Sequence, residues 1–262
     1  MSYRKYSLPY KPDQKTPYRL SRSKLELFMQ CKRCFWLDAR LKISRPSSPP
    51  FNINKAIDEL FKKEFDIYRA KKEPHPLMKQ AKIMAIPFAH EHLDKWRQSF
   101  GVDAGIDYLD TDTNLHIFGA VDDVWVDNKD QLIVVDYKAT AKDKPVTSLG
   151  PEGSWHDMYR RQMEIYQWLF KKNGFKVSDT GYFVYATTNS LADKFDNQLK
   201  FETFVFPHKG STDWVDKLIP EVKSVLEDDG MPPVGQSAMG GACEHCLYSR
   251  SRTELTLKFL NK

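Results

Sequence analysis

Two aspartates and a lysine are the residues of this chain whose placement best suits chemistry. The segment QLIVVDYKAT, residues 131–140, puts Asp136 and Lys138 directly after four apolar residues. Charge at the end of a buried strand is costly unless something pairs with it. The upstream segment NLHIFGAVDDVWV, residues 114–126, offers Asp122, because the residues DNKD between the two segments are typical of a hairpin turn.

A hairpin centred on Lys129 would place Val126 opposite Leu132 and Asp122 opposite Asp136. Directly opposed like charges on a sheet repel, so this pair calls for a cation, and oxygen ligands suit Mg²⁺ or Mn²⁺. Lys138 lies two residues beyond Asp136 and projects from the same face, where it could orient water or offset charge on a phosphate. The alternative is a strand that simply emerges into solvent, and a slip of one residue would separate the acids.

The four cysteines form two pairs with C-x-x-C spacing, Cys31 with Cys34 and Cys243 with Cys246. Each pair can reach one tetrahedral metal centre, so a shared metal would join the two ends of the chain. We favour a four-thiolate site over four buried free thiols because no cysteine is left over. Zinc and an iron–sulfur cluster both use such ligands, and the sequence spacing does not choose between them.

Periodicity and breaker residues predict helices and strands in an order that favours an α/β or α+β fold around a mixed sheet. The expected helices cover residues 21–41, 54–71, 87–100, 156–174 and 212–229, and the expected strands cover 114–126, 131–140, 180–189 and 199–207. Residues 231–252, around the second cysteine pair, are expected to be loop-like.

The charge of the chain is modest overall, at +5, but it is concentrated near the start. Residues 1–46 hold twelve Lys and Arg against three Asp and Glu, interleaved with Tyr3, Tyr6, Tyr10 and Tyr18. Such a segment suits a phosphate-rich partner, although a solvated tail is the simpler interpretation. Without a long apolar run, we expect no membrane association and a cytoplasmic, intracellular protein.

Taken together, these residues resemble the core of the PD-(D/E)xK nucleases. Gly119-x-x-Asp122 followed by Ile133-Val134-Val135-Asp136-Tyr137-Lys138 is similar to the RecB-like branch, which includes the CRISPR-adaptation exonucleases with a four-cysteine cluster. That branch also carries Gln-x-x-x-Tyr on the next helix, here Gln162 and Tyr166. The resemblance covers about residues 20–250. It implies a restriction-endonuclease-like core, with residues 1–20 as a basic arm and 21–262 as one domain: largely helical over 21–110, catalytic over 111–210, and a helix with a cysteine-bearing tail over 211–262.

The resemblance also implies roles for these residues in a metal-dependent nuclease acting on DNA. Asp122 and Asp136, with the backbone carbonyl of Tyr137, would hold Mg²⁺ or Mn²⁺, while Lys138 would position water, and Gln162 and Tyr166 would orient the strand. The family usually has a histidine ligand on an early helix, and here Asp58 stands in its place. The resemblance also implies that the cysteines hold a [4Fe-4S] cluster. Zinc is the alternative, because cluster-bearing relatives usually place one cysteine early and three late, whereas this chain has two early and two late.

The expected activity is that of an exonuclease on single-stranded or end-containing DNA, with a helicase or other DNA repair or CRISPR proteins as possible partners. A different class is an inactive nucleic-acid-binding or structural subunit of a repair or helicase assembly, because fold does not fix function.

Overall fold

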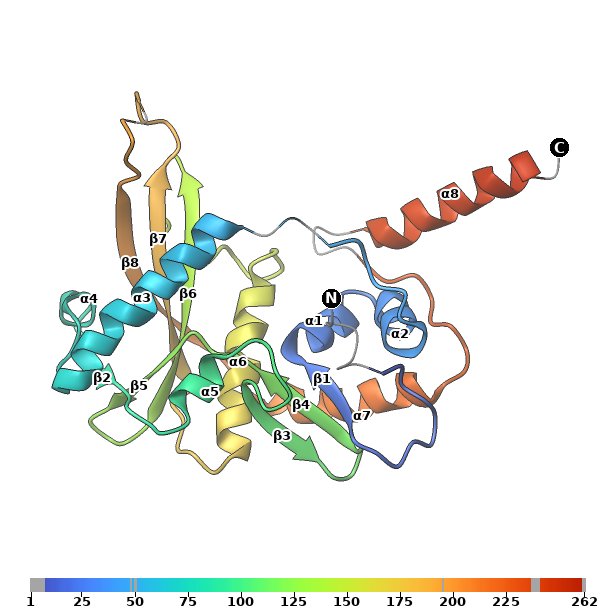
Figure 1. Ribbon diagram of the computed structural model, residues 1–262, viewed down its shortest axis with the longest axis horizontal. Helices are drawn as coiled ribbons and strands as arrows, with labels where there is room; N and C mark the ends of the chain where they lie inside the picture. Colours follow the sequence, from blue (N-terminus) through green and yellow to red (C-terminus); the bar gives the residue numbers. More distant parts are fainter. Residues whose placement is uncertain (1–7, 48, 50, 195, 237–240, 261–262) are drawn as a thin grey trace.

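A mixed sheet of five strands forms the centre of the molecule in the computed structural model, which describes residues 8–47, 49, 51–194, 196–236 and 241–260. The strand order is β2-β5-β6-β7-β8 (Figure 1). The strands are β2 (Ala85–Pro87), β5 (Asp123–Asp127), β6 (Leu132–Lys142), β7 (Thr180–Asn189) and β8 (Phe201–Lys209). β6 and β7 are parallel, and the other neighbours are antiparallel. The predicted mixed α/β fold class is therefore confirmed.

The hairpin of β5 and β6 has the predicted register. Val126 pairs with Leu132, and the last pair toward the sheet end is Asp123 with Val135. The turn is closed by Asp127, whose Oδ1 accepts hydrogen bonds of 2.8 Å from the backbone amides of both Lys129 and Gln131. Asp122 and Asp136 therefore come together where the paired strands end.

A second sheet of three strands, in the order β1-β4-β3, changes the predicted chain path. It consists of β1 (Tyr18–Ser21), β3 (Ile106–Asp110) and β4 (Leu115–Gly119), of which neither β1 nor β3 was predicted. The expected single strand over 114–126 is wrong, since β4 and β5 belong to different sheets. The chain leaves one sheet and enters the other at residues 120–122, and Asp122 lies at this crossing.

Two long helices cover the two faces of the main sheet. α6 (Asp157–Lys172) packs its Met163 and Ile165 with Val134 in one apolar core, while α3 (Asn52–Lys71) packs Phe61 and Phe65 in the other. α6 also forms the crossover connection between β6 and β7, because parallel strands cannot be joined by a short hairpin. Both helices end close to the predicted positions.

The N-terminal helix predicted over residues 21–41 is two helices, α1 (Arg22–Gln30) and α2 (Lys32–Leu41). They separate at Cys31, whose backbone is extended, with φ −157° and ψ 102°. Tyr10 and Tyr18 are buried in the larger core, so neither a solvated tail nor an exposed basic segment describes this part of the chain. Tyr3 and Tyr6 lie outside the described residues.

The other helices show two further differences from the prediction. Residues 87–100 form only α5 (Leu93–Arg97), preceded by β2 and by α4 (Pro76–Gln80), and α7 (Asp213–Glu227) accommodates Pro220 within it. The tail expected to be loop-like forms α8 (Glu244–Leu260), which projects from the body in Figure 1. Among the described helices, none combines the length and apolarity that a membrane span requires.

Candidate active site and cysteine cluster

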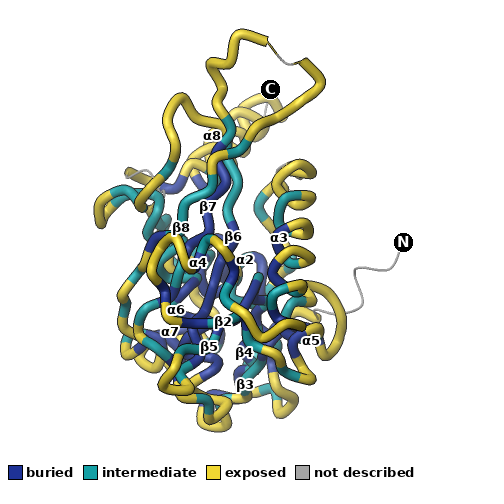
Figure 2. Tube along the Cα trace, turned by 90° about the vertical axis from the view of Figure 1, so that its left-hand side faces the viewer, coloured by how far each residue is buried: buried dark blue, intermediate teal, exposed yellow. Residues whose placement is uncertain are grey.

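The candidate site lies where the main sheet passes from the core into solvent. β6 is buried over its first six residues and becomes exposed by its end, as the tube in Figure 2 shows for the strands of this sheet. Asp136 is fully buried at this boundary, and the Lys138 side chain, one step along the same face, is 17% exposed. The geometry therefore sets a carboxylate and an amine side by side at the edge of the core.

Asp122 and Asp136 are close enough to affect each other's charge. Burial, and then the charge of Asp136, raises the pKa of Asp122 to about 6, which Lys138 and Lys62 only partly oppose. Asp122 Oδ2 accepts a hydrogen bond of 2.9 Å from the backbone amide of Tyr137, the residue that follows Asp136. The two acids thus meet across the hairpin end without a full complement of positive charge.

Asp136 itself is held by two side chains from different elements. Lys138 forms an ion pair with its Oδ2, and Gln162 of α6 donates a hydrogen bond of 2.8 Å to its Oδ1. Burial alone would lower the pKa of Lys138, but Asp136 and Asp122 outweigh it, so the pKa is raised and the amine stays protonated. Lys138 can therefore act as a hydrogen-bond donor and a positive charge.

Asp58 of α3 lies near the same pair. Burial and the charge of Asp122 raise its pKa, although its Oδ2 accepts a hydrogen bond of 2.7 Å from Lys62. Its Oδ1 is buried and has no hydrogen-bond partner among the described residues. A cavity of about 220 Å³ between α3 and β6 is lined by Asp58, Lys138 and Tyr159, and offers room for a ligand.

Tyr166, one helical turn after Gln162 on α6, packs against Gly119, the first residue of the Gly119-x-x-Asp122 motif. A Cβ atom at Gly119 would lie 2.5 Å from Tyr166 Cε1, so only glycine permits this close approach. The side chain of Tyr137 points to the opposite face of the sheet, where its hydroxyl donates to Asp123. The structure thus brings Asp58, Asp122, Asp136, Lys138, Gln162 and Tyr166 to one region, while Tyr137 reaches it through its backbone.

Asp123 follows Asp122 directly but has a different environment. It is fully buried, and its Oδ1 accepts hydrogen bonds from Arg69 at 2.6 Å and Arg97 at 2.9 Å, while its Oδ2 accepts from Tyr137 at 2.7 Å. Two guanidinium groups therefore neutralise this carboxylate. Asp123 is therefore fully paired within the core, whereas the pKa of its neighbour Asp122 is raised.

The carboxylates fit a hydrated divalent ion better than a closed protein cage. Among the described residues, only the four cysteines form a group of three or more metal-binding side chains with ligand atoms within 4.8 Å of one another. The acids are more widely spaced, yet Asp136 raises the pKa of Asp122 and Asp122 raises the pKa of Asp58, whose Oδ1 has no partner among the described residues. Mg²⁺ usually keeps several waters and takes only one or two carboxylates, which suits this arrangement.

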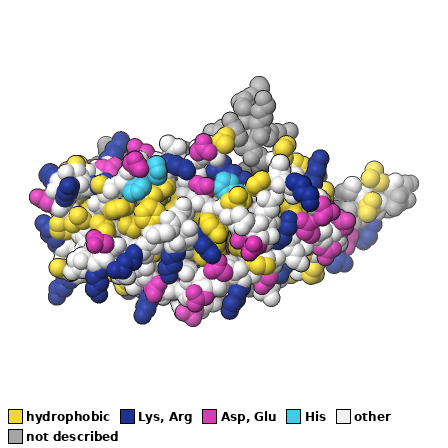
Figure 3. Space-filling view, turned by 90° about the horizontal axis from the view of Figure 1, so that it is seen from below, with side chains coloured by type: hydrophobic (Ala, Val, Ile, Leu, Met, Phe, Trp, Pro, Cys, Tyr) yellow, Lys and Arg dark blue, Asp and Glu magenta, His cyan; other side chains and the backbone are white. Residues whose placement is uncertain are grey.

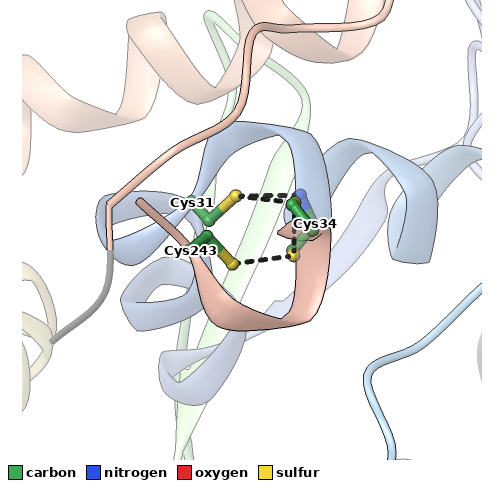
Figure 4. A group of neighbouring side chains, drawn as sticks. Cys31, Cys34 and Cys243 are labelled. Atoms are coloured by element: carbon green, nitrogen blue, oxygen red, sulfur yellow. Dashed lines mark hydrogen bonds between the residues drawn. The ribbon is translucent and has the colours of Figure 1, made fainter. Parts of the chain in front are cut away.

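The two cysteine pairs meet as the sequence predicts. The sulfurs of Cys34 and Cys246 are 3.5 Å apart, and the pairs Cys31–Cys246 and Cys34–Cys243 are each separated by 3.7 Å. The labelled side chains in Figure 4 point toward a common centre from the N- and C-terminal segments. Four buried thiols in this arrangement can bind a metal ion.

The surroundings of the cysteines support this close packing. A Cβ atom at Gly235 would lie 2.5 Å from Cys31 Cα, so the absence of a side chain lets the C-terminal segment approach. Arg45 donates a hydrogen bond of 3.4 Å to Cys243 Sγ. Its positive charge would offset part of the negative charge that four metal-bound thiolates carry.

Several residues near the acids were not identified from the sequence. Lys62 lies four residues after Asp58 on one helical face, so its spacing was a usable signal. The ring of Tyr159 lies 4.7 Å from Lys138 Nζ, and no local pattern pointed to this contact. Arg69 and Arg97 are likewise distant in sequence from Asp123. Long-range partners of this kind need the fold to be known.

Surface charge does not mark every face as a nucleic-acid interface. On the face shown in Figure 3, Lys and Arg side chains alternate with Asp and Glu over the visible described residues. A basic surface continuous enough to bind a phosphate backbone by charge alone is therefore not evident on that face.

Comparison with known proteins places most of this chain in one family. The model described as "PD-(D/E)XK nuclease superfamily" matches residues 50–251, which include all the site acids and the second cysteine pair. The solved structure described as "Crystal structure of SSO0001" is 14% identical and covers 85% of this chain and 82% of its own, with a TM-score of 0.32. No curated protein matches the chain.

The raised pKa of Asp122 predicts a pH-dependent cost of stability. Because the folded pKa of about 6 exceeds the usual 3.8, the stability from this carboxyl is complete below about pH 4 and is lost as the pH rises through about 6. In EDTA, Asp122→Asn should therefore melt at a higher temperature than the parent at pH 7.5, with the difference vanishing near pH 4. Equal melting temperatures at both pH values would contradict this prediction.

The adjacent substitution Asp123→Asn should have the opposite effect. Removing the charge that pairs with Arg69 and Arg97 in the core should cost about 3–5 kcal/mol of unfolding free energy. Urea denaturation of the two matched variants at pH 7.5 measures the contrast. Similar changes for both would mean that the environments of the two aspartates do not differ as described.

Proposed function

Because this chain belongs to the PD-(D/E)XK nuclease superfamily, we propose that it hydrolyses phosphodiester bonds of DNA with Mg²⁺ or Mn²⁺ held by Asp122 and Asp136. The observation that carries the proposal is the meeting of these two acids beside Lys138, with the pKa of Asp122 raised to about 6. Acids that share charge in this way lack a cation, and a divalent ion would supply it. Asp58 is the proposed third carboxylate, and the carbonyl of Tyr137 a further ligand.

Each side chain of the site has a proposed task. When bound, the ion would neutralise phosphate oxygens and lower the pKa of an attacking water. Lys138, kept protonated by the acids, donates to that water or to a phosphate oxygen. Gln162 fixes the orientation of Asp136 through its 2.8 Å hydrogen bond. Together these contacts hold the reacting groups in place before the substrate arrives.

A finer assignment to the RecB-like branch, with exonuclease action on single-stranded or end-containing DNA, is part of the same proposal. It is supported by Gln162 and Tyr166, which stand one turn apart on α6 and contact the motif residues Asp136 and Gly119. An active enzyme is favoured over an inactive subunit because a purely structural protein gains nothing from crowding Asp58, Asp122 and Asp136.

We also propose that the four cysteines bind a single zinc ion. Around one tetrahedral ion with Zn–S bonds of about 2.3 Å, the sulfurs lie about 3.8 Å apart. The observed separations of 3.5 to 3.7 Å are close to this value. A [4Fe-4S] cluster binds each thiolate to a different iron and therefore spreads the sulfurs more widely, so the spacing favours the zinc alternative.

The nuclease assay uses two variants of the site and two of the hairpin turn. Asp136→Ala and Lys138→Ala should lower cleavage in Mn²⁺ or Mg²⁺ by at least about 10²-fold, since each removes charge aligned with the reacting phosphate. Lys129→Ala and Asp130→Ala, on the exposed turn of the same hairpin, are the matched controls and should cleave normally. Linear and circular single strands, and blunt duplexes, distinguish exonuclease from endonuclease action. Full cleavage by pure Asp136→Ala would exclude this site.

Metal analysis tests the cysteine site separately. The purified protein should be colourless and hold one zinc per chain, and Cys246→Ser should lose the metal and melt at a lower temperature. Tyr248→Ser, on the exposed side of the same helix, is the control and should retain zinc. A brown protein that contains iron and acid-labile sulfide would instead establish a cluster.

A further inference from the structure

An arginine from the N-terminal segment lies beside the candidate site. Arg22 is the first residue of α1, and its Cβ would lie 3.3 Å from a Cβ atom at Gly119, which would also contact Tyr166. Residues from α1, β4 and α6 therefore meet at the end of the Gly119-x-x-Asp122 motif. Arg22 precedes the residues 50–251 that match the family model.

Within the described part of the chain, the side chain of Arg22 contacts Tyr166 but forms no ion pair. Among the described residues, its buried Nε has no hydrogen-bond partner, and no carboxylate pairs with it. Other arginines near the site differ, since Arg161 pairs with Glu26, and Arg69 and Arg97 pair with Asp123. A partly buried guanidinium without an acid is costly unless a ligand supplies the negative charge.

Tyr166 interacts with this guanidinium and with both acids. Burial raises the pKa of Tyr166, and Asp122 and Asp136 act in the same direction, while contact with Arg22 acts against them. Tyr166 thus interacts with all three charged groups. Arg22 and the acid pair therefore both lie within electrostatic range of one side chain.

We propose that Arg22 binds a non-bridging phosphate oxygen of the substrate strand next to the Asp122–Asp136 site. The inference rests on the proposed nuclease function and adds a residue that holds the substrate. Two acids repel a phosphate, and Lys138 already pairs with Asp136, so a second cation on the flank is needed to anchor the strand. The forked guanidinium suits this task because it can donate two parallel hydrogen bonds to phosphate.

The fold holds α1 in a way that fixes this anchor. Glu26, one turn after Arg22, accepts hydrogen bonds of 2.9 and 2.6 Å from Nε and Nη2 of Arg161 on α6. The helix ends at Cys31, one of the four clustered cysteines. α1 is thus attached to α6 through Glu26, near the middle of α1, and to the cysteine cluster at the C-terminal end of α1.

The test measures binding without cleavage. A fluorescent single-stranded DNA is titrated in EDTA with the parent, Arg22→Ala, Arg22→Lys and Lys129→Ala at several salt concentrations. Arg22→Ala should weaken binding about tenfold or more and reduce the slope of log K against log salt by about 0.7, the value of one phosphate contact on a single strand. Arg22→Lys keeps the charge and should keep the slope, but should cleave more slowly in Mn²⁺ because it lacks the fork.

Lys129→Ala removes the same charge nine residues before Lys138, roughly 30 Å away along β6, and should bind as the parent does. A folded Arg22→Ala protein with the parent's affinity and slope would overturn the inference. If that variant melts below the assay temperature, Arg22→Gln takes its place with the same expected slope. Failure of the nuclease proposal alone would give a different result, because the parent protein would then bind DNA without cleaving it. A parent protein that binds no DNA would overturn both the nuclease proposal and the inference about Arg22.

Discussion

Repulsion between two carboxylates at the end of a buried hairpin is the constraint around which the site is built. Asp122 and Asp136 meet because the turn at residues 128–131 fixes the register of β5 and β6. Three groups reduce the cost of that meeting: the backbone amide of Tyr137, the side-chain amide of Gln162 and the amine of Lys138. The pKa of Asp122 nevertheless remains raised, so the compensation is incomplete.

The environment of Asp123 shows that the lack of compensating positive charge is specific to the Asp122–Asp136 pair. One residue away, on the opposite face of the same strand, the chain surrounds a carboxylate with Arg69, Arg97 and the hydroxyl of Tyr137. The protein therefore has the means to neutralise a buried aspartate and uses them on the packing face only. The shortage of positive charge on the other face is what the proposed divalent ion and phosphate would make up.

The sequence predicted the hairpin well because its information is local. Alternating apolar residues on both sides of a turn set the pairing of Val126 with Leu132, and the acids followed from it. The change of sheet between β4 and β5 was concealed because apolar residues continue on both sides of residues 119–123, which suggested one strand. The break at Cys31 was hidden for a similar reason. Both flanking helices continue one amphipathic period, and only the approach of the distant segment at Gly235 accounts for an extended residue between them.

Arg22, Arg69 and Arg97 could not be predicted, because their partners are brought near only by the fold.

The helix α1 connects the candidate active site to the cysteine cluster. Its nine residues span about 14 Å, with a guanidinium beside the acids at one end and a thiol at the other. A helix of this length is stiff. If the cysteines hold the proposed ion and Arg22 the proposed strand, loss of that ion or oxidation of the thiols would free one end of the helix and weaken DNA binding at the other. The redox state of the surroundings would then affect DNA binding from the far end of α1.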